Sequence, residues 1–184
     1  MAVYRARIAL AVAGLAVAVL SGCRSDVKVE KVCPRVAVLS DAGSLTKFAS
    51  PAGRDILDID FQGEIADIVA SCEYSDDKKN RQVAVQVAPV FAVSRGAANT
   101  DRTAKFTYFV SVIRGEQILT KQEFETSTDF AGNRTRVVFQ DSEPVSIDIP
   151  LAYRAAEYEY EVLLGFQLTP EELDYNKKWR TVGR

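Results

Sequence analysis

Residues 158–168 read YEYEVLLGFQL, and this stretch decides the fold. All of its even-numbered residues are apolar, whereas Glu159, Glu161 and Gln167 occupy odd-numbered positions. A period of two residues is typical of a β-strand that packs one face on a core and turns the other face to water. The stretch therefore predicts a strand with one buried face.

Shorter runs with the same period recur along the chain, separated by polar or glycine-containing turns. Each run carries apolar residues two positions apart, as half-buried strands do. We expect strands around residues 36–39, 56–61, 65–74, 83–87, 106–112, 118–125, 137–139 and 145–149. About seven to nine short strands joined by turns predict a mainly β fold, namely an antiparallel β-sandwich of the immunoglobulin-like kind. A small closed barrel is the alternative.

One short helix is expected at the C-terminal end of the chain. Thr169 can serve as the N-cap, Pro170 suits the first helical position, and Glu172 completes a capping box. We expect this helix to end near Lys178. Because the chain shows no alternation of strands and helices and no internal repeat, residues 33–184 are predicted to form a single sandwich domain.

The N-terminal segment has the features of an export signal. Arg5 and Arg7 precede an apolar run of 13 residues, Ile8–Leu20. A membrane-spanning helix needs about 20 apolar residues, whereas the apolar part of a signal peptide has roughly 7–15. The segment is therefore predicted to be a cleaved signal peptide.

The end of this segment, Leu20–Cys23, reads LSGC and resembles the lipobox of bacterial lipoproteins. The resemblance implies removal of residues 1–22, attachment of lipid to the Cys23 thiol and acylation of the new amino terminus. Several acyl chains hold a protein on a bilayer far more firmly than one chain does. The residue after the lipidated cysteine is Arg24 and not the aspartate that tends to retain such proteins in the inner membrane. The implied place is the bacterial cell envelope, at the outer membrane and facing the periplasm.

Residues 23–32 would then be the lipidated N-terminus and a short tether. The nine residues from Arg24 to Val32 reach only about 30 Å when fully extended. The membrane is thus an expected partner through the lipid, and the domain is expected to stay close to it.

The mature chain also resembles a group of alphaproteobacterial lipoproteins of unassigned activity. The segments that carry the resemblance are Cys33–Val38, Gly53–Asp55 and Cys72–Tyr74. It would cover most of the mature chain, and it implies no activity.

Two cysteines remain once Cys23 is lipidated. An exported protein meets an oxidising compartment, so a Cys33–Cys72 disulfide is the natural interpretation. Closing a loop of this size stabilises a fold by roughly 4 kcal/mol at best. Two buried free thiols are the alternative.

The composition argues against several classes of function. The chain contains no histidine, which removes the Ser-His-Asp, Cys-His and His-metal sites together. The formal net charge of −2 becomes −4 when Arg5 and Arg7 leave with the signal peptide, so electrostatic support for nucleic-acid binding is missing. We therefore predict a protein that is not an enzyme, with no catalytic residues, no cofactor and no metal site.

Three patterns are weighed as interaction sites. The segment Asp58–Gly63 imitates the start of a calcium loop, but Val69 stands where the last acidic ligand belongs, so acidic side chains facing water are the preferred interpretation. Glu157, Glu159 and Glu161 could bind a cationic partner, although a solvated strand face explains them as well. The third pattern, residues 175 and 179, is a tyrosine and a tryptophan that share one side of the helix, where they dock on the sandwich or anchor a partner.

Two functions follow from these observations. The first is a non-enzymatic, membrane-anchored module that faces the periplasm and acts in envelope structure or in binding an envelope protein. The second is a sandwich that binds a small ligand, a lipid or a glycan, either in the gap between its sheets or at the polar loops 94–104 and 129–134.

Overall fold

Strands make up most of the described chain. The computed structural model describes residues 32–49, 54–75, 81–151 and 159–182, all of which belong to one compact unit that spans Lys31–Arg184. The elements in chain order are β1 (Arg35–Val38), β2 (Ser44–Phe48), the 3-10 turn η1 (Ile56–Asp58), β3 (Ile59–Tyr74), β4 (Gln82–Arg95), β5 (Thr103–Arg114), β6 (Gln117–Asp129), β7 (Arg136–Gln140), β8 (Val145–Pro150), β9 (Tyr160–Phe166) and α1 (Pro170–Val182).

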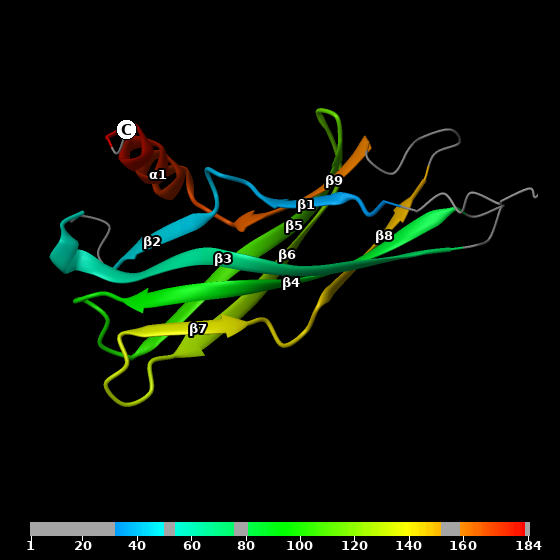
Figure 1. The fold of residues 1–184 in the computed structure, drawn as a ribbon. Helices are drawn as coiled ribbons and strands as arrows, with labels where there is room; N and C mark the ends of the chain where they lie inside the picture. The colour runs from blue at the N-terminus through cyan, green and yellow to red at the C-terminus, as the bar shows by residue number, and fades with distance from the viewer. Residues whose placement is uncertain (1–31, 50–53, 76–80, 152–158, 183–184) are drawn as a thin grey trace, which may run out of the picture. The chain divides into compact units, whose positions relative to one another are not determined.

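The strands form two sheets that pack face to face (Figure 1). The first sheet has the order β1-β9-β5-β6, and the second has the order β2-β3-β4-β7, with β8 also paired to β4. Every pairing is antiparallel except that of β1 with β9, which is parallel. The predicted β-sandwich with one C-terminal helix is therefore confirmed. The two sheets are separate, so the alternative of a small closed barrel is wrong.

The strand order within the second sheet is a meander, because β2, β3 and β4 are consecutive in the chain and adjacent in space. The sheets of an immunoglobulin constant domain contain strands A, B, E, D and C, F, G instead. The sandwich thus has its own strand order, in which β1 and β9, the first and last strands, lie side by side.

The stretch that predicted the fold lies in the centre of the first sheet. In β9 the even-numbered residues Tyr160, Val162, Leu164 and Phe166 are all buried. β9 pairs with β5 on one side and with β1 on the other, so its inward face meets the second sheet along its whole length. The period-two pattern therefore identified a core strand.

Aromatic rings fill the space between the sheets around Phe91 of β4. Its ring is fully buried, and its centroid lies 5.0 Å from Phe106, 5.2 Å from Tyr108, 5.6 Å from Phe139 and 5.8 Å from Phe166. Aromatic pairs at these spacings add attraction beyond the area that they bury. A single side chain thus links β4, β5, β7 and β9.

The strand expected at residues 56–61 begins later than predicted. Ile56 lies in η1, and its side chain is 74% exposed, whereas Ile59 and Phe61 of β3 are buried. The cause is a capping box, in which the Asp55 carboxylate accepts from the Asp58 amide and the Asp58 carboxylate accepts from the Asp55 amide. The Asp55 carboxylate also accepts from the Ile56 amide. These local hydrogen bonds favour a turn over an extended strand.

α1 starts as predicted and packs against β2. The Thr169 amide donates to the Glu172 carboxylate over 2.8 Å, and the Glu172 amide donates to the Thr169 hydroxyl over 3.3 Å. The Tyr175 ring meets the Phe48 ring edge-on at 5.3 Å, and Lys47 pairs with Glu172 at 3.0 Å. The helix continues to Val182, beyond the end expected near residue 178.

We predict that Phe91→Ala lowers the free energy of unfolding by about 3–5 kcal/mol, because it leaves a cavity among four rings that cannot close over it. Urea denaturation measures this. The matched control is Val138→Ala on β7, whose side chain is 59% exposed. The control should change the free energy of unfolding by less than about 0.5 kcal/mol. Equal effects of the two substitutions would contradict the described core.

Candidate functional site

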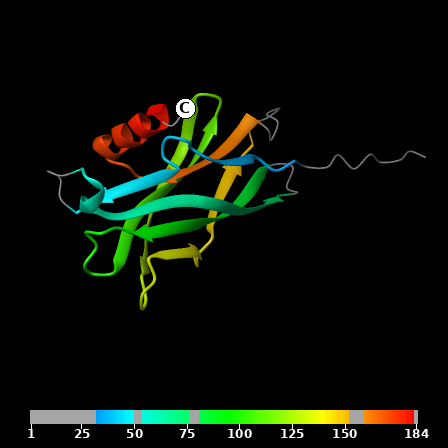
Figure 2. The same ribbon diagram turned by 60° about the vertical axis from the view of Figure 1, so that its left-hand side comes forward.

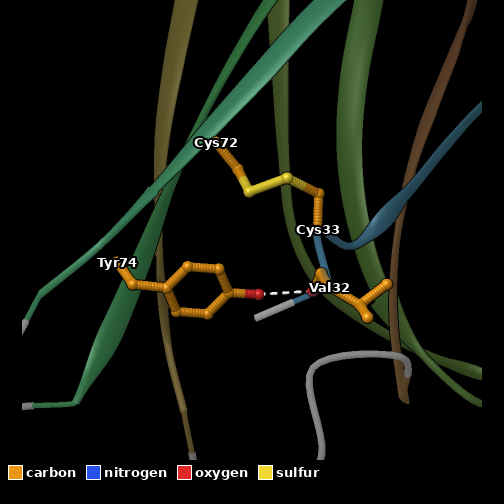
Figure 3. Close-up of a disulfide and its surroundings, with 4 residues drawn as sticks. All are labelled: Val32, Cys33, Cys72 and Tyr74. Carbon is orange, nitrogen blue, oxygen red and sulfur yellow. Dashed lines mark hydrogen bonds between the residues drawn. A yellow bond between two sulfur atoms is a disulfide. The ribbon is translucent and has the colours of Figure 1, made fainter. Parts of the chain in front are cut away.

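A disulfide bond between Cys33 and Cys72 lies where the described chain enters the sandwich, and it confirms the pairing predicted from the two remaining cysteines. Cys33 precedes β1 and Cys72 lies near the end of β3; their Cα atoms are 5.9 Å apart, which suits a disulfide. Figure 3 shows the bond joining the two segments. Cys33 is exposed and Cys72 is half-buried. The alternative interpretation, two buried free thiols, is therefore wrong.

A hydrogen bond beside the disulfide holds the same segment. The Tyr74 hydroxyl donates to the Val32 carbonyl oxygen, as Figure 3 shows. Cys72 and Tyr74 are two positions apart on β3, so their side chains leave the strand on the same face. We call the set Val32, Cys33, Cys72 and Tyr74 the entry clamp. After it, Pro34 is buried and the chain pairs with β9.

A groove of about 810 Å³ lies on the second sheet, on the face turned away from the core. Gln62 and Ser94 on its floor alternate along their strands with the buried residues Phe61 and Val93, so they point outward. α1 borders the groove with Tyr175, and the segment before β3 borders it with residues 54–56. Figures 1 and 2 show α1 and η1 flanking the β2 end of this sheet.

The groove combines polar groups with apolar surface. The Gln62 amide donates to the Thr46 hydroxyl over 3.3 Å, and both residues line the groove. Glu64 and Arg136 line it with opposite charges. Ile56 adds an exposed apolar side chain. This mixture suits a ligand with hydroxyl or amide groups on one side and an apolar surface on the other.

The groove and the entry clamp lie at opposite ends of β3. Gln62 and Gly63 line the groove near the start of the strand, and Cys72 lies near its end. A strand rises about 3.3 Å per residue, so roughly 30 Å separates the two features. The groove therefore lies far from the point where the described chain enters the sandwich.

A second hollow, of about 520 Å³, opens beside β6 and is lined by carboxylates, among them Glu123, Glu125 and Glu143. At its base the buried Tyr108 hydroxyl donates to the Asp141 carboxylate over 2.8 Å. Burial, and then the hydrogen bond to Asp141 together with its negative charge, raise the pKa of Tyr108 well above its ordinary value. Tyr108 is therefore a neutral hydrogen-bond donor that ties β5 to the segment after β7.

The calcium-like segment has structural roles. The Asp58 carboxylate caps η1, and the Asp60 carboxylate accepts from the Asn99 amide over 2.7 Å. Among the described residues, no group of three or more His, Cys, Asp or Glu side chains could hold a metal ion. Asp58 and Asp60 are thus half-buried and hydrogen-bonded within the fold, where we expected acidic side chains that face water.

The polar loop expected at residues 94–104 is shorter and tightly built. Only residues 96–102 lie outside the strands, and Asn99, which is buried, holds them together. Its amide donates to Asp60 and to the Thr103 carbonyl oxygen, and its oxygen accepts from the Arg102 amide. A Cβ on Gly96 would lie 2.0 Å from the Ile59 carbonyl oxygen, so only glycine fits there. The polar groups of Asn99 are thus used to close the loop.

Of the three glutamates considered as a site for a cationic partner, Glu159 and Glu161 each lie close to an arginine. Glu159 pairs with Arg114 at 2.9 Å, and Glu161 lies 3.9 Å from Arg35. Glu157 lies outside the described residues. On the helix, Tyr175 docks on β2, in agreement with the docking interpretation, whereas the side chain of residue 179 is outside the described part. Cys23 also lies outside it.

Sequence reasoning did not find the groove. Its lining comes from β2, β3, β4, β7, the segment before β3 and α1, and it spans residues 44 to 176. On each strand these residues look like ordinary outward-facing positions. Only the packing of α1 against β2 turns them into a concave surface. In the sequence, the aromatic residue Tyr175 on one side of the helix was the sign of this packing.

Comparisons of the chain with protein-family models, with curated proteins and with solved structures each gave no match. In the described part of the chain, no helix is long and apolar enough to cross a bilayer.

We predict that reduction of the Cys33–Cys72 bond lowers the free energy of unfolding by at most about 4 kcal/mol, because the unfolded chain regains the freedom of a loop with a separation of 39 residues. Urea denaturation with and without reductant measures the change. The control is the double variant Cys33→Ser with Cys72→Ser, which should be less stable and insensitive to reductant. A wild-type protein whose free energy of unfolding does not change on full reduction would contradict the clamp.

Proposed function

We propose that this protein is a lipid-anchored, non-enzymatic binding module of the bacterial envelope, held at the outer membrane and facing the periplasm. The observation that carries the proposal is the entry clamp. It fixes the first described residues to β3 only ten positions after Cys23, the proposed lipidated residue. A tether that extends about 30 Å needs a firm attachment point if it is to hold the domain near the bilayer.

The binding role is supported by what the surface offers. The groove is open, mixed in polarity and remote from the clamp. The chain has no histidine to act as a general base near neutral pH, which favours binding over catalysis. The proposed partner is an envelope protein that meets the sandwich on its exposed surfaces.

The anchor is tested by Cys23→Ser, which removes the thiol that would take up lipid. We predict that the wild type undergoes signal-peptide cleavage, that the variant does not, and that the mass of the variant lacks any acyl group. Gel mobility and partitioning into the detergent phase measure this. The matched control, Cys33→Ser with Cys72→Ser, also replaces cysteines but keeps Cys23, so it should still mature and partition with the detergent. Unchanged processing of Cys23→Ser would contradict the anchor.

A second candidate function, glycan or small-ligand binding, is favoured by the groove itself. The gap between the sheets holds packed aromatic rings, so the outer face of the second sheet replaces it as the proposed site. Side-chain amides and hydroxyls such as Gln62 and Thr46, beside the ring of Tyr175, suit the alternating polar and apolar faces of a sugar.

This candidate predicts that peptidoglycan-derived disaccharide peptides shift the NMR signals of the groove. Gln62→Ala should weaken their binding about tenfold, since one good polar contact is worth roughly 1.4 kcal/mol. Gln140→Ala, an exposed glutamine of β7 that does not line the groove, is the control and should bind as the wild type does. The absence of these shifts, or binding that both substitutions weaken equally, would contradict this candidate function.

A further inference from the structure

The edges of the two sheets differ in length. β1, β2, β7 and β8 have between four and six residues, and β8 ends in Pro150. β6 lies at the edge of the first sheet and has 13 residues, with neither proline nor glycine. Proteins normally protect an exposed edge by keeping it short or by placing proline on it. β6 uses neither of these two devices, although it carries a bulge at Leu119 and the charged side chain of Lys121.

One side of β6 has no neighbouring strand in the described part of the chain. The strand pairs with β5 from Asp129 opposite Thr103 to Gln117 opposite Arg114, and the sheet ends there. Near its start, Ile118 and Leu119 are 65% and 44% exposed. The strand thus offers a row of backbone donors and acceptors next to apolar side chains, which is the surface that another strand recognises.

The charges of β6 indicate which strand would fit. Phe124 packs against the core, so the odd-numbered residues Lys121, Glu123 and Glu125 lie on the opposite, outer face. An antiparallel copy of β6 placed with Gln122 opposite the partner's Gln122 brings Lys121 opposite the partner's Glu123. Lys121 already pairs with Glu123 of its own chain at 3.0 Å, so the symmetric contact joins two such pairs into a network of four alternating charges at the centre.

Neighbouring registers are worse. Side chains that face each other across two strands must lie on the same face of the sheet, so the twofold axis must pass through a residue position. An axis at Lys121 or at Glu123 places that residue opposite its own copy, and an axis at Phe124 sets Glu123 opposite the partner's Glu125. Like charges directly opposite each other destabilise a strand pair. Among the registers centred on residues 120–124, only the one centred on Gln122 sets opposite charges against each other without also opposing like charges.

We propose that β6 pairs antiparallel with β6 of a second copy of this chain, in the register centred on Gln122, so that the two first sheets join into one continuous sheet. The contact is isologous, since the same strand serves both partners. The pairing does not depend on the lipid or on the groove.

The first test is a cysteine at the axis. Gln122→Cys should form a disulfide-linked dimer on mild oxidation of the full chain in native membranes, because directly opposite Cβ atoms lie about 4.5–5.5 Å apart. Gln117→Cys is the control, since that residue and its copy lie roughly 34 Å apart in this register. On a non-reducing gel, we expect at least about tenfold more dimer from Gln122→Cys. Equal yields from the two variants, or a link to a different protein, would overturn the proposal.

The second test reverses the charges. Lys121→Glu places four carboxylates around the axis and should lower the fraction of dimer about tenfold or more. Adding Glu123→Lys to that variant restores opposite charges across the axis and should restore the dimer, although Lys121 and its contacts with Gln167 and Phe109 are still lost. Native mass spectrometry of the detergent-extracted chain gives the dimer fraction. A dimer that survives Lys121→Glu, or that the second substitution fails to restore, would contradict the register.

Discussion

The bond between Cys33 and Cys72 determines where the chain joins the sandwich. β1 is a strand of four residues at a sheet edge and pairs in parallel with β9. So short a strand contributes few hydrogen bonds of its own, and what holds its ends adds to the packing of Val36 and Val38 against the core. The disulfide and the Tyr74 hydroxyl hold the end before β1. The second sheet is thereby linked covalently to the start of the first.

The clamp also sets the geometry of anything attached before it. The groove lies roughly 30 Å away along β3, and the free edge of β6 is at the side of the first sheet opposite to β1. If two copies pair through β6, antiparallel symmetry puts their clamps at opposite ends of the joined sheet. Both proposed tethers then reach one bilayer only when the strands run along its plane. The proposed dimer and the proposed anchor together therefore imply a module that lies flat on the membrane.

Local patterns in the sequence predicted the local features well. Period two in residues 158–168 identified β9, and the Thr169–Glu172 pattern identified the start of α1, since each signal comes from residues that contact one another along the chain. Ile56 misled the same reasoning, because the hydrogen bonds of Asp55 outweigh its apolar character. The groove and the free edge of β6 arise from segments far apart in the chain, so no single window of sequence could reveal them.

The most direct test of the account is the intact mass of the protein extracted from membranes. We predict a chain that begins at Cys23, carries acyl groups, and weighs two hydrogen atoms less than the fully reduced form, because Cys33 and Cys72 are joined. Reduction should restore those two hydrogens and leave the acyl mass in place. A chain that begins at Met1 without acyl groups would contradict the anchor. A chain whose Cys33 and Cys72 are free thiols would contradict the clamp.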